Sequence, residues 1–161
     1  MSLGTFVAGR YTAAWNSVAI GLCTEGYEVQ MEPKEAMINR SDAFGDTMID
    51  TIHRGADWFC QFEAMESWTA SIKSIVSPYA TFGLLGVIGQ LGSAVCFPLV
   101  LTSTAGTPAA TSPSTFTATL AKLASNSNPR WQFNSVLRTC PIRMQLYPYS
   151  NTGTITFFAL T

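Results

Sequence analysis

The sequence predicts a mainly β protein: a small antiparallel β-barrel or sandwich with one packed α-helix, at about residues 67–77, and long loops. Two observations predict this class. Several segments alternate apolar and polar residues, a period of two that is typical of strands buried on one face. One segment has helical spacing instead. The 161 residues fit a single domain, residues 1–161, and a chain of this size can bury roughly two-thirds of its unfolded surface.

The strands follow from this alternation. In the segment 27–32, Tyr27, Val29 and Met31 fall on one face, and Glu28, Gln30 and Glu32 fall on the other. The same pattern recurs in three other segments: Thr115–Leu120, Ile142–Tyr147 and Thr154–Phe157. Four further strands are expected at Tyr11–Trp15, Thr47–His53, Trp58–Ala64 and Val95–Thr102. Residues 54–57, with the sequence Arg-Gly-Ala-Asp, are expected to form a hairpin turn between two of them.

The helix is predicted from an apolar stripe with the spacing i, i+4, i+7, i+8 and i+11. The stripe consists of Trp68, Ile72, Ile75, Val76 and Tyr79. Ser67 is a suitable N-cap, and Pro78 ends the helix because it disfavours the helical conformation of the residue before it. One helix among about eight strands favours a small barrel or sandwich with the helix packed on it.

Two segments fit neither class. The segment 35–45 interrupts the alternation between two strands and is too long for a tight turn, so we expect a loop. The segment 102–114 is rich in Thr, Ser, Ala, Pro and Gly and is expected to be an exposed loop. Long loops in a compact domain are often binding sites.

Charge is low and unevenly distributed. Charged residues make up 12% of the chain, about half the usual share for a soluble domain. All ten acids lie between Glu25 and Glu66, so residues 1–66 carry a formal charge of −6 and residues 67–161 carry +5. The two halves could neutralise each other within one subunit, or an acidic surface of one subunit could meet a basic surface of the next.

The composition argues against several other classes. The first ten residues lack the features of a signal peptide, and the four cysteines are expected to be reduced thiols. The segment 82–101 is free of charge and apolar, as a membrane span would be, but its four glycines and Pro98 make a poor helix and no basic residues flank it. We expect no membrane association.

Catalytic and cofactor chemistry have little support. His53 is the single histidine, which excludes a two-histidine metal site. There is no phosphate-binding glycine loop, no carboxylate pair typical of a glycosidase, and too few clustered bases for specific nucleic-acid binding. We therefore expect no enzyme activity, no catalytic residues, no metal and no cofactor.

Two stretches of the N-terminal half resemble the major tail tube proteins of long-tailed phages, a family related to the inner tube of the type VI secretion system. These are residues 21–29, Gly-Leu-Cys-Thr-Glu-Gly-Tyr-Glu-Val, and residues 41–55, Ser-Asp-Ala-Phe-Gly-Asp-Thr-Met-Ile-Asp-Thr-Ile-His-Arg-Gly. The order of motifs matches to about Tyr79, and the resemblance is looser afterwards.

The resemblance implies a structural virion protein made in the host cytoplasm. Six subunits would form a ring, and stacked rings would form the tail tube through which DNA leaves the capsid without specific binding. The other partners would be the terminator, baseplate and tape-measure proteins. The segment 35–45 would be the loop that contacts the neighbouring ring. Its candidate contact residues are Met37, Ile38, Arg40, Asp42 and Phe44.

A DNA conduit must not retain the phosphate backbone, so a lumen lined by carboxylates and neutral polar groups is favoured. The polar face Glu28, Gln30 and Glu32 is the first candidate for the lumen, and Gln61 with Glu63 is the second. The sequence does not decide between this role and an ordinary solvated face. The alternative functions are a tail terminator or baseplate ring protein of the same barrel type, or a monomeric binding domain or small enzyme.

Overall fold

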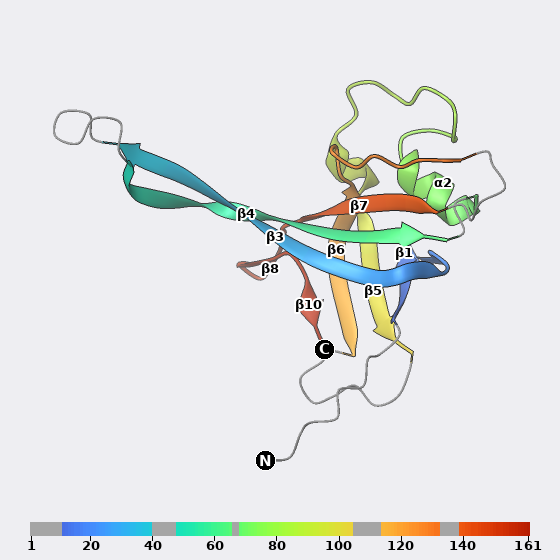
Figure 1. The fold of residues 1–161 in the computed structure, drawn as a ribbon, viewed down its shortest axis with the longest axis horizontal. Helices are drawn as coiled ribbons and strands as arrows, with labels where there is room; N and C mark the ends of the chain where they lie inside the picture. The colour runs from blue at the N-terminus through green and yellow to red at the C-terminus, as the bar shows by residue number, and fades with distance from the viewer. Residues whose placement is uncertain (1–10, 40–47, 66–67, 105–113, 133–138) are drawn as a thin grey trace, which may run out of the picture.

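A computed structural model describes residues 11–39, 48–65, 68–104, 114–132 and 139–161. These residues form ten strands, one α-helix and one 3-10 helix (Figure 1). The strands are β1 (Tyr11–Trp15), β2 (Val18–Ala19), β3 (Cys23–Asn39), β4 (Met48–Ala64), β5 (Phe97–Ser103), β6 (Thr115–Leu123), β7 (Cys140–Tyr147), β8 (Tyr149–Asn151), β9 (Thr154–Thr156) and β10 (Ala159–Leu160). The helices are α2 (Ala70–Val76) and η1 (Gly92–Val95).

Eight of the strands form one antiparallel sheet. Its order is β2-β1-β5-β6-β7-β4-β3, with β10 paired to β6 beside this path. The hairpin β8–β9 forms a separate two-stranded sheet. The mainly β class with one helix is confirmed. The large sheet does not close on itself, so the sandwich-like form of the prediction fits and the closed barrel does not.

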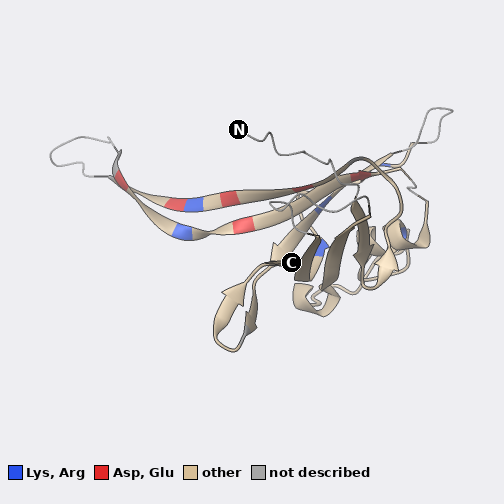
Figure 2. Ribbon diagram, turned by 90° about the horizontal axis from the view of Figure 1, so that it is seen from below, with Lys and Arg blue, Asp and Glu red and all other residues tan. Residues whose placement is uncertain are grey.

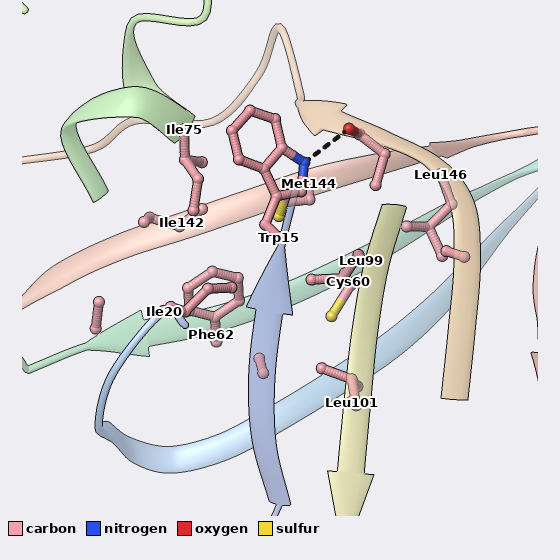
Figure 3. Packing of buried hydrophobic residues seen from close by; sticks show 14 of the residues in the cluster. Trp15, Ile20, Cys60, Phe62, Ile75, Leu99, Leu101, Ile142, Met144 and Leu146 are labelled. Atoms are coloured by element: carbon pink, nitrogen blue, oxygen red, sulfur yellow. Dashed lines mark hydrogen bonds between the residues drawn. The ribbon is translucent and has the colours of Figure 1, made fainter. Parts of the chain in front are cut away.

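The core lies on one face of this curved sheet (Figure 3). Alternate residues of β7 are buried there, in agreement with the predicted period of two. Trp15 of β1 is also buried, and its indole Nε1 donates a hydrogen bond of 3.0 Å to the carbonyl oxygen of Ala121. Burial raises the pKa of the Cys60 thiol to about 12, which keeps the thiol protonated at neutral pH.

The helix α2 covers part of the core through Ile72 and Ile75, both fully buried. It is shorter than predicted. Thr69 is its N-cap, because the Thr69 hydroxyl accepts a hydrogen bond of 3.4 Å from the backbone N–H of Ile72. Ser67, the predicted cap, lies outside the described residues. The helix ends at Val76, ahead of Pro78, as the sequence predicts.

The predicted hairpin turn at residues 54–57 is wrong, because β4 runs through these residues without a break. Gly55 has a φ of 106°, and the pairing register shifts there: Pro33 faces Ala56, whereas Glu35 faces His53. One extra residue therefore lies in β4 opposite Lys34, which is a β-bulge. Glycine in a strand pattern is compatible with either a turn or a bulge.

The predicted loops also begin later than expected. Residues 35–39 form the end of β3 and pair with β4, so they are strand and not loop. Residues 40–45 of that predicted loop lie outside the described residues. Likewise, Thr102 and Ser103 belong to β5, and most of the predicted loop 102–114 lies outside the described part of the chain.

The β3–β4 hairpin has two distinct parts. Trp58–Ala64 of β4 pairs with β3 on one side and β7 on the other. Beyond this point, Pro33–Asn39 and Met48–Ala56 pair only with each other among the described residues. We call these two ranges the outer ribbon. It projects well away from the body of the protein (Figure 1).

The described core predicts that replacing two different leucines by alanine has very different effects on the free energy of unfolding. Leu99 is fully buried in β5, whereas Leu85 is 87% exposed. We expect Leu99→Ala to lower the free energy of unfolding by about 2–5 kcal/mol, through lost burial and the remaining cavity. The control Leu85→Ala should stay within about 0.5 kcal/mol of the wild type. Urea unfolding in dilute solution measures both, and equal effects of the two substitutions would contradict the described core.

Candidate functional site

The side of the hairpin opposite the core carries the polar residues that the sequence analysis selected. In the antiparallel register, Glu28 lies opposite Gln61, and Glu32 lies opposite Asp57. Residues directly opposite each other share a face of the sheet, and so do residues two apart on one strand. All five lumen candidates therefore lie on one face, which we call the polar face: Glu28, Gln30, Glu32, Gln61 and Glu63.

Glu28 is at the centre of a hydrogen-bonded group on this face. The side-chain amide of Gln30 donates to one carboxylate oxygen of Glu28 at 2.7 Å, and that of Gln61 donates to the other at 2.8 Å. The hydrogen bonds from Gln30 and Gln61 hold the pKa of Glu28 below its ordinary value, because they stabilise the ionised form. Glu28 is thus a carboxylate at neutral pH, exposed to solvent.

Arg143 of β7 is a base on the polar face. Its guanidinium forms an ion pair with Glu32 and lies 3.8 Å from the centre of the Phe59 ring, a cation–π contact. The Arg143 side chain is only 20% exposed. The positive charge is therefore engaged by an acid and an aromatic ring of the same subunit and presents little surface to solvent.

Glu63 lies at the edge of a cleft of about 550 Å³. Its carboxylate accepts hydrogen bonds from the hydroxyls of Thr24, at 3.4 Å, and Thr139. The cleft is lined by polar groups from both charge halves of the sequence, among them Glu28, Gln61, Asn128 and Arg130. The part of the chain that the structure describes has no group of three or more His, Cys, Asp or Glu arranged to hold a metal.

Charged residues lie along both strands of the β3–β4 hairpin (Figure 2). On the polar face over residues 28–34, 57–63 and 141–143, four carboxylates accompany two bases: Glu28, Glu32, Asp57, Glu63, Lys34 and Arg143. Lys34 pairs with Asp57 at 2.6 Å. The Arg143–Glu32 pair joins the basic half of the sequence to the acidic half, so the two halves neutralise each other in part within one subunit. The polar face nevertheless keeps an excess of carboxylates.

The outer ribbon carries the predicted contact residues that the structure describes. Met37 is 69% exposed and Ile52, on the paired strand, is 55% exposed, whereas Ile38 is half-buried. The candidates Arg40, Asp42 and Phe44 lie outside the described residues. Exposed apolar side chains on a projecting ribbon are typical of an interaction surface.

Two residues of the polar face were missed by the sequence analysis: Arg143 and Phe59. The alternation of the segment 142–147 does put Arg143 on the polar side of its own strand. However, nothing in the sequence pairs β7 with β4, and that pairing is what sets Gln61 opposite Arg143.

No helix in the described residues has the length and apolar character needed to cross a membrane.

No protein-family model and no curated protein matches this sequence. Two solved structures are similar to it. One is the sheath/tube terminator of the extracellular contractile injection system PVC in its extended state, with a TM-score of 0.48 and 7% identity, covering 90% of this chain and 92% of that chain. The other is Hcp1 from Flavobacterium johnsoniae, with a TM-score of 0.42 and 10% identity, covering 91% of this chain and 98% of that chain.

The hydrogen bonds to Glu28 predict a measurable pKa change. Replacing both donors, Gln30→Ala and Gln61→Ala, should raise the pKa of the Glu28 carboxyl towards its ordinary value, since the ionised form loses its stabilising bonds. In the wild type these bonds stabilise the fold above the ordinary pKa, and this contribution is lost as the pH falls through the lowered value. A carbon-detected NMR titration of the Glu28 carboxyl measures the change. Gln145→Ala, on the neighbouring strand, is the control and should leave this pKa unchanged.

Proposed function

We propose that this chain is a structural subunit of a phage-type tail tube: six copies form a ring, rings stack, and DNA passes through the lumen during ejection. The observation that carries the proposal is the outer ribbon. Its two strands pair only with each other in the described residues, yet each projects several residues beyond the body. An isolated two-stranded hairpin is at best marginally stable in water, so contact with another subunit would stabilise it.

The composition supports assembly. Charged residues amount to only 12% of the chain, and several large apolar side chains of the ribbon and of the loop after α2 are more than half exposed. A soluble monomer usually carries more charge and smaller apolar patches. The sheet is also open at β3, whose outer edge has no strand beside it among the described residues. Free strand edges favour association.

The polar face supports the conduit role. Carboxylates repel the phosphate backbone, and each retained cation–phosphate contact would add affinity for DNA. The single arginine on this face of β7 is occupied by Glu32 and the Phe59 ring, so its charge is poorly placed to hold a phosphate. A lumen lined by this face would let DNA slide past. We propose Glu28, Gln30, Glu32, Gln61 and Glu63 as its lining.

The implied partners follow from this role. We propose that the protein is made in the host cytoplasm and resides in the virion tail, where it contacts other copies of itself and the terminator, baseplate and tape-measure proteins. No cofactor and no catalytic step are required. The outer ribbon, together with the connection that follows Asn39, would make the contact between rings.

Assembly is the first test. Purified wild-type protein at tens of micromolar should form hexameric rings and tubes of indefinite length, which mass photometry and negative-stain electron microscopy measure. Single rings that do not stack would instead identify a terminator or baseplate ring protein. A protein that stays monomeric, even when mixed with baseplate complexes as an initiator, would refute the proposal.

The lumen assignment is tested by reversing charge on the polar face. In Glu28→Lys, a lysine that reaches a phosphate should steepen the dependence of DNA retention on salt by roughly 0.9 in the log–log slope. Tubes should still assemble, because Glu28 is exposed, but DNA release from particles should slow, most of all at low salt. Ser74→Lys adds a lysine on the exposed side of α2, away from the polar face, and should not change release. Equal release rates for both variants would exclude this face as the lumen.

A further inference from the structure

The segment between α2 and η1 exposes the most apolar surface in the described protein. Five of its large side chains are two-thirds or more exposed: Leu84 (68%), Leu85 (87%), Val87 (69%), Ile88 (85%) and Leu91 (75%). We call residues 84–91 the apolar loop. Monomeric proteins rarely expose large apolar patches, so five exposed large apolar side chains within eight residues are unusual.

The apolar loop is held in place by contacts at both of its sides. A Cβ on Gly86 would come within 2.8 Å of the Tyr79 Cβ, and one on Gly92 would come within 2.8 Å of the Lys122 Nζ. Lys122 in turn donates a hydrogen bond of 3.4 Å to the Tyr79 hydroxyl, and its Nζ lies 5.8 Å from the centre of the Tyr147 ring. The exposed side chains are therefore presented by an anchored loop.

The surroundings favour a protein partner over a lipid surface. The chain has no charged residue from Ser74 to Ala121. Segments that lie in a membrane interface usually combine an apolar face with lysine and arginine on the polar face. The apolar loop has no such bases of its own, and Lys122 beneath it is engaged by the two tyrosines. An apolar protein surface matches it best.

The same chain exposes an apolar strip on one face of the outer ribbon. Ile52, 55% exposed, lies opposite Ala36 and shares that face with Ile38, whereas Met37 lies on the other face, opposite Thr51. The two apolar surfaces are far apart: in Figure 1 the ribbon extends to the left, and the connection after α2 lies at the upper right of the body. They cannot meet within one subunit. A head-to-tail contact between two copies would cover both at once.

We propose that the apolar loop is the docking surface for the outer ribbon of a second copy of this chain. The inference rests on the proposed function and names the two surfaces that join its subunits. Because the surfaces differ, the contact is heterologous, and repetition gives a ring or an open-ended stack. A symmetric contact between two apolar loops would leave Ile52 uncovered.

Three isoleucine-to-aspartate variants test the pairing. Ile88→Asp alters the apolar loop, and Ile52→Asp alters the ribbon. Ile155→Asp, on the separate hairpin β8–β9, is the control, with 69% exposure. All three side chains are more than half exposed, so each variant should fold, which circular dichroism checks. The first two should weaken self-association at least about tenfold, and the control should match the wild type by analytical ultracentrifugation.

An equimolar mixture of Ile88→Asp and Ile52→Asp is the decisive experiment. The first variant keeps an intact ribbon and the second keeps an intact loop, so one good contact can still form. We expect each Ile88→Asp chain to bind one Ile52→Asp chain and no further copies. The product is a heterodimer, or a pair of unlike rings if each variant forms rings by itself. Native mass spectrometry with one variant isotopically labelled detects it. Failure of the mixture to associate would overturn the pairing.

The remaining outcomes separate this inference from the proposed function. If the wild type assembles and Ile88→Asp assembles equally well, the pairing is wrong although the proposed function stands. If the wild type does not assemble at all, both fail. Flotation with neutral phosphatidylcholine vesicles provides the last comparison. If the wild type binds the vesicles and Ile88→Asp does not, the apolar loop binds lipid and the proposal is overturned.

Discussion

The pairing of β3 with β4 is the constraint on which the rest of this structure depends. Both strands are 17 residues long, and they pair with each other from the body of the protein to the outer ribbon. The body and the ribbon are therefore parts of one continuous hairpin. Over Trp58–Ala64, β4 is a central strand with β7 on its other side, and Phe62 points into the core. Since successive side chains alternate, the opposite side of the same segment carries the polar face. One stretch of backbone thus supplies the packing of the body and the chemistry of its surface.

Much of the body could be predicted from the sequence because each element has a local cause. The period of two in β7 and the helical stripe through Ile72 and Ile75 arise from one side of each element facing the core. The polar alternation of the segment 27–32 predicted one face shared by Glu28, Gln30 and Glu32, and the register of β3 agrees. These features need no knowledge of which strands are neighbours.

The features that sequence reasoning missed depend on contacts between distant segments. Gly55 is compatible with a turn or a bulge, and only the partner strand β3, continuing past Pro33, decides for the bulge. For the same reason residues 35–39, which lack clear alternation, are strand: their backbone groups pair with β4. The position of Arg143 beside Glu32 required the order of β3, β4 and β7, which local patterns do not contain.

The outer ribbon has a mechanical consequence. Two-stranded ribbons twist more strongly than wider sheets, because no third strand restrains them. Gly55 adds a bulge near the point where the ribbon leaves the body, and bulges bend the strand that contains them. The body, by contrast, is braced by strands on both sides of β4. In a filament whose subunits are linked through such ribbons, curvature would be absorbed by the linkers while each body keeps its shape. Compliance in bending would then be a property of the connection, set by the residues Pro33–Asn39 of β3 and Met48–Ala56 of β4.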